Sequence, residues 1–571
     1  PYQIKVNDEK KQQVWDSGKI ENSLSVGIQY SGEALKPRTR YHYTVTIWDE
    51  ENEQHSKTSW FETGLMSTKI EAWNQAKWIG VSDEDLNFYS HYLSVFKLDY
   101  SIQLDRAFKS TKASFLMGGN DTRLMDRNKN IQGVRSSINE SYIEFEFDTA
   151  PLNFGKNAKL HVYRVGYSEE DQKNVPFRSF EIPRALVNTA NQYEQHQFYI
   201  QSNFGLVEIF LNGNQEEHKI SENDDPSNSP RAREGFNLNP VGAGNNYISF
   251  HMVGDIGFSI DPRQKASFSN IKILNFRSPS NTLFHDDMSR KDYTGLFSSL
   301  VNEHPNVVFQ EHQIKVSGGD KGLLVLKDPS KSSTPMLRTE FELPSKKVVK
   351  ARLYLTSRGI YEIHLNGKRL GNEYFNPGLT QYNKHHLYQT YDLTDQILSQ
   401  SKNAIGIWLS EGWWSGNITY SGENWNFFGD RQSVLAQIIV TFEDGSEKII
   451  TSNTSDWKVF TEGPIRYGSF FQGEVYDARL NAVIKGWSNP DFNDTLWKAA
   501  TEVPLEQTTY QEEDFNFNEL QFKGKMGEAA KIVKTIQPIS MDEVRPGVFV
   551  YDMGQNMVGI PKVVLPKGNK G

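Results

Sequence analysis

Alternation of apolar and polar side chains is the strongest pattern in this chain, and it predicts β-strands. The clearest example runs from residue 351 to residue 365. Its apolar face would consist of Ala351, Leu353, Leu355, Tyr361, Ile363 and Leu365, and its wetter face of Arg352, Glu362 and His364. Asn366-Gly367 follows directly and suits a two-residue hairpin turn, in which both central residues need positive φ. We therefore expect half-buried strands here, with a further strand at 403–409.

The same period of two recurs earlier in the chain. Residues 41–47 alternate apolar with polar side chains, as do 142–147 and 207–211, and the last of these precedes a second Asn-Gly pair. Residues 35–64 resemble a fibronectin type III module, with a proline-bearing turn, an aromatic strand, a polar turn and a last strand. We predict an all-β protein with several β-sandwich domains in tandem, of fibronectin III-like and jelly-roll or concanavalin-like design.

Length and composition limit the classes of protein that fit. A chain of 571 residues is too long for one hydrophobic core, so three to five domains are expected. The net charge of -9 argues against nucleic acid as a partner. No apolar run approaches the roughly 20 residues that a membrane-spanning helix needs. The absence of cysteine excludes disulfides, thiolate metal sites and a cysteine nucleophile.

Several sequence motifs in the second half of the chain carry a family resemblance. They are GIYEIHLNGKRLG at 359–371, PGLTQYNKHHLYQTYDLTD at 377–395 and NAIGIWLSEGWW at 403–414. In this order they resemble the N-terminal β-sandwich domain of bacterial α-L-rhamnosidases, glycoside hydrolase family 78. Residues 473–497 are similar to the closing words of that domain, and YDMGQNMVG at 551–559 looks like the start of the next β-domain.

This resemblance suggests how the chain divides into domains. The predicted parts are 1–66, a fibronectin III-like module with its first strand clipped; 67–83, a link; 84–331, an inserted jelly-roll or laminin-G-like domain; 332–503, the rhamnosidase N-terminal β-sandwich; and 504–571, the truncated start of the next rhamnosidase β-domain. The inserted domain is the main departure from the simplest family layout, and we predict that it can be a carbohydrate-binding module.

The resemblance also implies a function for the parent protein. Family members hydrolyse terminal α-L-rhamnosides of plant polysaccharides or glycosides with inversion, without a required cofactor, and the family implies a periplasmic or secreted location. Their acid and base lie on an (α/α)₆ barrel, which would begin beyond Gly571. We therefore expect no catalytic residue in this chain, which alone would be inactive, would scaffold its own C-terminal barrel and would bind a rhamnose-containing glycan. The alternative is a stand-alone carbohydrate-binding or surface adhesion protein.

Two kinds of residue are candidates for a site near the end of the 403–409 strand. Trp413, Trp414, Tyr420 and Trp425 cluster among Gly and Asn residues, and flat aromatic faces bind the apolar faces of sugars. The alternative for these rings is packing at the sandwich edge or on a neighbouring domain. The carboxylates Glu411, Glu474 and Asp477 lie in similar Trp- and Tyr-rich words, but contacts to turns and to solvent explain them better than catalysis does.

The inserted domain offers a second set of candidates. Asn120, Asp121 and Arg123 could bind sugar hydroxyls, and oxygen ligands such as those of Asp121 suit a hard cation. Asp224 and Asp225 form a weaker acidic pair for a metal. Inserted jelly rolls in family members can be calcium-assisted rhamnose-binding modules, so the resemblance makes calcium an optional ligand of this domain. The alternative for all five residues is ordinary loop polarity.

Overall fold

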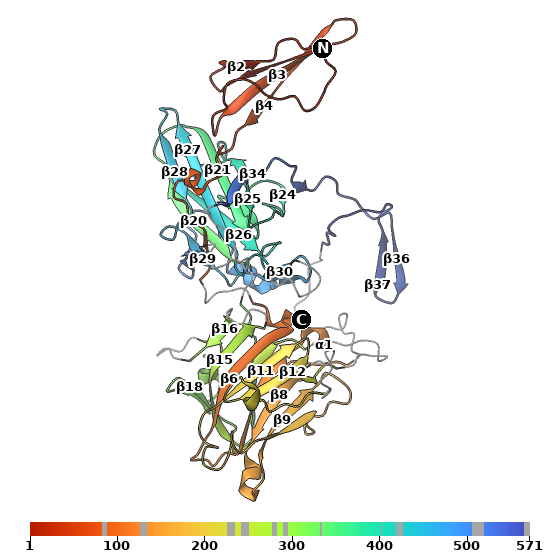
Figure 1. Cartoon of the computed structure of the whole chain (residues 1–571), viewed down its shortest axis with the longest axis vertical. Coiled ribbons are helices and arrows are strands. Elements are labelled where there is room, and N and C mark those ends of the chain that lie inside the picture. The colour runs from red at the N-terminus through yellow and green to blue at the C-terminus, as the bar shows by residue number, and fades with distance from the viewer. Residues whose placement is uncertain are drawn as a thin grey trace.

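Three β-rich bodies follow one another along the long axis of the computed structural model, as Figure 1 shows. The structure describes residues 1–82, 88–125, 134–224, 234–240, 251–276, 282–288, 295–331, 334–399, 401–416, 418, 426–504 and 519–564. The first module lies at one end, the second sandwich in the middle and the inserted domain at the other end. The prediction of an all-β protein built from tandem β-domains is confirmed.

The first module contains one four-stranded antiparallel sheet, in the order β2-β1-β3-β4. Its strands are β1 (Tyr2–Asn7), β2 (Gln13–Asp16), β3 (Arg40–Trp48) and β4 (Gln54–Glu62). The alternation at 41–47 correctly predicted strand β3, but Ile47 is 49% exposed. Within this strand the burial switches faces, so that Thr46 is buried in place of its neighbour. The small core of the module explains why an apolar residue near the end of the strand stays uncovered.

The inserted domain is a two-layer sandwich of a six-stranded and an eight-stranded sheet. The first sheet has the order β10-β9-β8-β7-β14-β19, and the second has the order β13-β12-β11-β6-β15-β18-β17, with β16 paired to β15. One continuous hydrophobic core fills the space between them. The strands are β6 (Val95–Leu104), β7 (Lys112–Gly119), β8 (Tyr142–Asp148), β9 (Ala158–Val165), β10 (Arg178–Ile182), β11 (His196–Asn203), β12 (Leu206–Leu211), β13 (Phe236–Asn237), β14 (Asp255–Ile260), β15 (Lys265–Asn275), β16 (Thr282–Asp286), β17 (Val307–Gln310), β18 (Gln313–Ser317) and β19 (Leu323–Lys327).

The second sandwich packs a six-stranded sheet, β23-β22-β26-β20-β29-β32, on a seven-stranded one, β33-β5-β27-β21-β25-β34 with β28 paired to β27. All six residues predicted for the apolar face of 351–365 are buried in its core, which confirms the alternation. The strands are β5 (Ile79–Gly80), β20 (Met336–Glu342), β21 (Val348–Arg358), β22 (Ile360–Leu365), β23 (Lys368–Arg369), β25 (His385–Asp392), β26 (Lys402–Ser410), β27 (Ser433–Phe442), β28 (Glu447–Thr451), β29 (Lys458–Phe460), β32 (Lys498–Ala499), β33 (Thr501–Glu502) and β34 (Gln521–Gly524).

The hairpin turn after β22 agrees with its prediction. Asn366 and Gly367 have φ of 49° and 80°, and Leu365 pairs with Lys368 across them. On the opposite face of β21, however, Arg352 is buried, although the pattern placed it on the wetter face. The first module covers it, because Glu62 at the end of β4 accepts hydrogen bonds from its guanidinium.

Two strands of the second sandwich come from outside the range predicted for it. β5 lies in the predicted link and pairs with β27 and β33, whereas β34 comes from the predicted final segment and runs parallel to β25. The domain boundaries otherwise stay predictions. Remaining pairs of short strands are β24 (Glu373–Tyr374) with β35 (Ala530–Lys531), β30 (Ile465–Ser469) with β31 (Gly473–Tyr476), and β36 (Ser540–Arg545) with β37 (Val548–Asp552).

The two ends of the inserted domain meet where it leaves the second sandwich. Phe88 and Lys331 form an antiparallel bridge, which brings the entering and departing chain together. Next to this bridge, Tyr89 and Tyr92 pack on Tyr467 of β30, with ring centroids 5.6 Å and 5.1 Å apart. This contact ties the inserted domain to the second sandwich.

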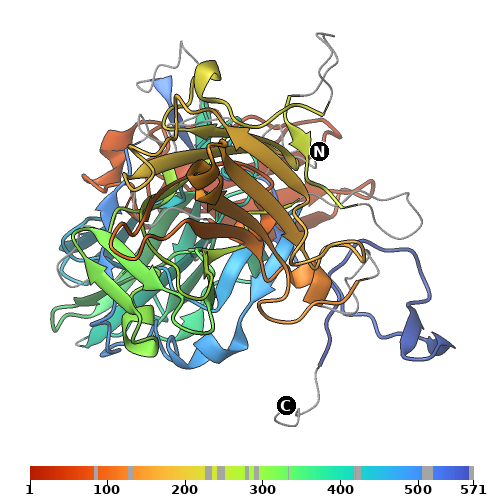
Figure 2. The ribbon, with the colours of Figure 1, turned by 90° about the horizontal axis from the view of Figure 1, so that it is seen from below.

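Helices are short throughout the described part of the chain. They are α1 (Thr122–Met125), α2 (Leu300–Glu303) and the 3₁₀ turns η1 (Ile70–Trp73), η3 (Ser90–Tyr92), η4 (Ala150–Phe154), η5 (Glu216–His218) and η8 (Ala478–Ala482). None of the helices in this part is long and apolar enough to cross a membrane. Seen from below in Figure 2, the β36–β37 hairpin stands away from the sandwiches, and its residues are exposed on both faces.

Candidate functional site

Trp414, one of the predicted sugar-stacking residues, belongs to the interior of the second sandwich. It follows β26, and its side chain is completely buried. The indole N–H donates a hydrogen bond of 2.9 Å to the carbonyl of Arg431, and the ring meets Tyr382 edge to face. Trp414 therefore offers no free face to a sugar, because both its ring and its polar atom have protein partners.

Trp413, by contrast, is half-buried and lies beside two other rings. Its centroid is 4.5 Å from that of Phe470 and 6.4 Å from that of Phe375, and these two phenylalanines are 5.3 Å apart. Phe375 and Phe470 are 38% and 37% exposed. We call Phe375, Trp413 and Phe470 the three-ring surface. Two exposed phenylalanine rings in contact with a half-buried tryptophan suit either a sugar or another protein domain.

Sequence reasoning missed two of these three rings. Phe375 follows β24 and Phe470 lies in the β30–β31 turn, so both are distant from Trp413 along the chain. The sequence offers little indication of either ring: Phe375 precedes Asn376-Pro377, and Phe470 lies two residues after Gly468. The predicted candidates Tyr420 and Trp425 lie outside the described residues.

The three carboxylates weighed as catalytic candidates lie in different environments. Glu411 is 3% exposed, and its Oε2 atom has no hydrogen-bond partner in the described part of the chain. Burial raises the pKa of Glu411 to about 8, and the Tyr467 hydroxyl offsets only part of this effect. Glu411 is therefore a protonated acid at neutral pH, enclosed by protein.

Glu474 and Asp477 occupy the protein surface instead. Glu474 is exposed on β31. Asp477 caps the η8 turn by accepting from the backbone N–H of Arg479, and it also pairs with the guanidinium of that residue at 2.7 Å. Hydrogen bonding to Arg479 lowers the pKa of Asp477 to about 2. These contacts agree with the alternative of turn-bound, solvated carboxylates.

In the inserted domain, the predicted residues at the end of β7 are hydrogen-bonded to one another and to their neighbours. The Asn120 amide donates to Asp255 at 2.7 Å, and its carbonyl oxygen accepts from the backbone N–H of Asn139. Arg123 holds Asp121 through Nη2 at 2.6 Å and Nε at 2.9 Å. Burial alone would raise the pKa of Asp121, but the bonds and charge of Arg123 lower it below its ordinary range. The carboxylate is thus already neutralised by a cation of the protein.

Of the weaker acidic pair, Asp224 and Asp225, only Asp224 belongs to the described residues. Asp224 accepts from the backbone N–H of Asn237 and lies 3.5 Å from the guanidinium of Arg178. Asp225 lies outside the described residues. Asp224 by itself has the contacts of a surface loop residue.

A polar cluster that sequence reasoning missed lies beside Asn120. His91 Nε2 is 3.1 Å from Asp255 Oδ1, and the Ser90 hydroxyl donates to Asp328 at 3.0 Å. Burial would lower the pKa of His91, but the hydrogen bond to Asp255 and the nearby carboxylates raise it. His91, Asp255 and Asp328 are spaced closely enough to hold a metal ion. Both carboxylates, however, already accept hydrogen bonds from protein donors. Because these residues are far apart in the sequence, the sequence alone did not indicate that they form a cluster.

Comparison with known proteins covers almost the whole chain. Residues 346–518 match the family model of the α-L-rhamnosidase N-terminal domain, and residues 1–67 match that of a Rha78A-like N-terminal immunoglobulin domain. An α-L-rhamnosidase of Streptomyces avermitilis is 28% identical over 96% of this chain and 44% of its own length. An α-L-rhamnosidase of Alteromonas sp. (strain LOR) is 35% identical over 42% of this chain and 24% of its own length.

The fold also has a counterpart among solved structures. The crystal structure of Streptomyces avermitilis α-L-rhamnosidase complexed with L-rhamnose has a TM-score of 0.51 and 24% identity to this chain. The match covers 97% of this chain and 45% of the solved one. The present chain therefore spans less than half the length of these relatives.

Proposed function

Because the chain belongs to the α-L-rhamnosidases of glycoside hydrolase family 78, as part of their N-terminal region, we propose that its whole protein hydrolyses terminal α-L-rhamnosides. The match of residues 346–518 to the family's N-terminal domain carries this proposal. The substrates would be rhamnose-containing plant polysaccharides or glycosides. A polymeric substrate favours action in the periplasm or outside the cell.

The present span would act as a scaffold and would not carry the chemistry. Inverting glycoside hydrolysis needs two carboxyl groups about 6.5–9.5 Å apart, with room between them for water and a sugar. Glu411 is enclosed, whereas Glu474 and Asp477 are surface residues. The acid and base would therefore lie in a catalytic barrel outside this span, and the three-ring surface is suited to pack against that barrel.

Sugar capture is the second role that we propose for this span. Asn120 and Arg123 place an amide and a guanidinium at one end of the inserted sandwich, and such groups hydrogen-bond sugar hydroxyls. Calcium would be an optional ligand of this region. Replacing Arg123 with alanine should weaken retention of the protein in a gel that contains a rhamnose-rich polysaccharide, and unchanged retention would remove this residue from the sugar site.

The whole-protein activity can be tested through its stereochemistry. The full-length protein would be incubated with 4-nitrophenyl α-L-rhamnoside, and the first sugar released would be observed by proton NMR. Inversion predicts that β-L-rhamnose appears before mutarotation mixes the anomers. Initial α-L-rhamnose would contradict inversion. Absence of hydrolysis, together with retained glycan binding, would favour a stand-alone binding or adhesion protein.

A further inference from the structure

A cavity of about 210 Å³ lies between the first module and the second sandwich. Its lining shares no residue with the three-ring surface or with the Asn120 region. Residues from β21, β27 and β28 form one side and residues of the first module the other; the lining consists of Glu9, Pro37, Arg38, Lys350, Arg352, Tyr354, Ile439, Thr441 and Glu447. At roughly 30 Å³ for a water molecule, it has the volume of several waters. It is smaller than the roughly 300–1,000 Å³ of sites for drug-sized ligands, so it suits a molecule of monosaccharide size.

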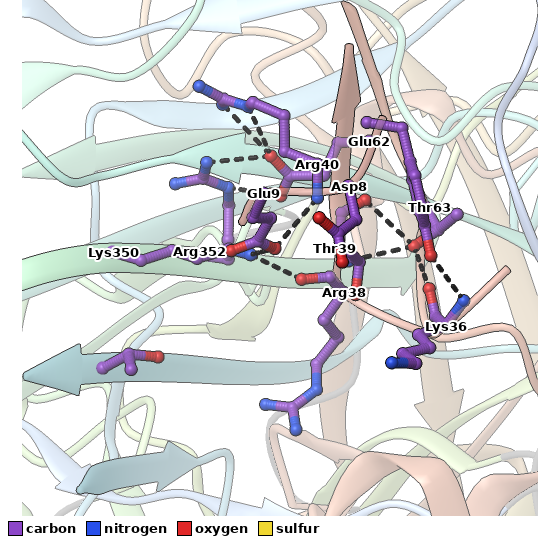
Figure 3. A network of polar contacts seen from close by, with 12 residues as sticks. Asp8, Glu9, Lys36, Arg38, Thr39, Arg40, Glu62, Thr63, Lys350 and Arg352 are labelled. Carbon is purple, nitrogen blue, oxygen red and sulfur yellow. Dashed lines mark hydrogen bonds and ion pairs between the residues drawn. The ribbon is translucent and has the colours of Figure 1, made fainter. Parts of the chain in front are cut away.

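Ion pairs hold the two sides of this cavity together, as Figure 3 shows. Three of the pairs that cross from the first module to the second sandwich involve cations of the lining: Arg352 with Glu62 at 2.6 Å, Lys350 with Glu9 at 3.0 Å, and Arg38 with Glu447 at 3.1 Å. Each cation of the lining therefore has an acidic partner. A charged ligand would have to compete with these ion pairs for a group of opposite charge, so the cavity favours an uncharged ligand.

The rim and the floor of the cavity differ in exposure. The side chains of Arg38 and Glu447 are 36% and 35% exposed, which places them at the solvent side. Tyr354 is fully buried, and Ile439 is almost so. The buried side of the cavity also includes the guanidinium of Arg352, which is 5% exposed. The cavity thus combines a charged rim with a floor of one aliphatic, one aromatic and one paired cationic side chain, and such a mixture can meet both the hydroxyl groups and the C–H face of a sugar.

Tyr354 supplies the independent sign of a ligand. Its hydroxyl is buried and has no hydrogen-bond partner among the described residues. Burial raises the pKa of Tyr354, so the phenol stays protonated and can both donate and accept. A buried hydroxyl without a partner costs free energy, which a ligand hydroxyl would recover by bonding to it.

We propose that this cavity binds a small, uncharged, polyhydroxylated molecule of monosaccharide size. The Tyr354 hydroxyl bonds to a hydroxyl of the ligand. The charged groups at the rim bond to other hydroxyls, and Ile439 and Pro37 contact its apolar face. This site is separate from any sugar site in the inserted domain, and it holds whether or not the whole protein hydrolyses rhamnosides.

The experiment uses the 571-residue protein with L-rhamnose and D-mannose as probes. Affinity is measured by titration calorimetry, and crystals soaked in each sugar locate the binding site. We expect density for one of the sugars in the cavity, with a hydroxyl within hydrogen-bond distance of Tyr354. Tyr354→Phe should reduce the affinity roughly tenfold. Without sugar its Tm should stay equal or rise, because no protein hydrogen bond is lost.

Tyr382→Phe is the matched control. Its hydroxyl donates to the carbonyl of Gly378 at 2.9 Å, so this variant should lose stability while its sugar affinity is unchanged. Water alone in the cavity of the soaked crystals would overturn the proposal, as would unchanged affinity in Tyr354→Phe. Sugar binding lost in Arg123→Ala but retained in Tyr354→Phe would assign the sugar to the inserted domain and also overturn it.

Discussion

Glu411 is a carboxylic acid that its surroundings keep neutral. Because its pKa rises from the ordinary 4.5 to about 8, the folded protein binds a proton that the unfolded chain releases between these values. The free energy of unfolding should therefore fall as pH rises from about 4.5 to 8, by roughly 4–5 kcal/mol from this group.

Glu411→Gln should remove that part of the pH dependence. The amide keeps the size of the side chain and carries no charge, so the variant should resemble the wild-type protein at pH 5 and exceed its stability at pH 8. Urea unfolding at both values measures the difference. Equal loss of stability in the two proteins between pH 5 and pH 8 would mean that Glu411 is ionised when folded.

The adjacent tryptophans should respond differently to truncation. Trp414→Ala removes a completely buried ring and should cost roughly 3–5 kcal/mol of stability. Trp413→Ala should cost clearly less, because its ring is partly exposed. Thermal unfolding of the two variants tests this order, and a larger loss for Trp413 would contradict the burial described above.

At the scale of single residues, the sequence indicated which side chains could form a site but not how buried they are or which partners they have. It grouped Trp413 with Trp414 because both are aromatic and neighbours, but Trp413 is half-buried and Trp414 is completely buried. It could not foresee that Arg123 neutralises Asp121, since a side-chain pair depends on the local backbone turn. Alternation reports which face a residue takes, and the packed structure decides what covers that face.

The β22–β23 hairpin is the element for which sequence and structure agree most closely. Asn366-Gly367 specified the turn because few residues other than glycine and asparagine accept positive φ at low cost. β5 and β34 were not predicted as parts of the same sandwich. Short edge strands carry little alternation, and their partners are far away along the chain.

Gly367→Ala should weaken this hairpin. Gly367 has a φ of 80°, and an added Cβ would lie 1.9 Å from the Asn489 side-chain oxygen. A loss of about 1–3 kcal/mol is expected from the strained φ and the forced movement of Asn489. Chemical unfolding measures it. Gly445→Ala is the control, since its φ is also positive but an added Cβ would meet nothing within 4 Å.

At the scale of the whole molecule, the first module is attached to the second sandwich by charge. Arg352 and Glu62 are nearly enclosed there, with side chains 6% and 10% exposed. Burial would raise the pKa of Glu62, but Arg352 lowers it below its ordinary range. Because the pKa of Glu62 is lower in the folded protein than in the unfolded chain, its ionised carboxylate stabilises the attachment at pH values above the unfolded pKa. This stabilisation is lost as the pH falls through the folded pKa.

Arg352→Met should detach the first module or loosen its position. Removing the cation leaves Glu62 partly buried with Arg40, at 3.1 Å, as its remaining ion-pair partner. The loss should therefore be smaller than the roughly 3–5 kcal/mol that a buried carboxylate without any partner costs. Small-angle X-ray scattering should give a broader distance distribution for the variant. The double variant Arg352→Met, Glu62→Gln should recover most of the compactness. An unchanged profile for the single variant would show that other contacts hold the module.

The order of the three bodies suits the scaffold role that we propose for this span. The inserted domain leaves and re-enters the second sandwich at the Phe88–Lys331 bridge, so the central sandwich keeps its own core intact. The first module and the inserted domain lie at opposite ends of it in Figure 1. The central sandwich thus positions the other parts, and it also carries the three-ring surface.

The most direct test of this account is the release of nitrophenol from 4-nitrophenyl α-L-rhamnoside by the purified 571-residue protein. We predict no turnover above a buffer control, because Glu411 is enclosed and the other two candidate carboxylates, Glu474 and Asp477, are surface residues. Turnover that is abolished by Glu411→Gln or by Glu474→Gln would contradict it. That result would place the chemistry within the sandwiches themselves.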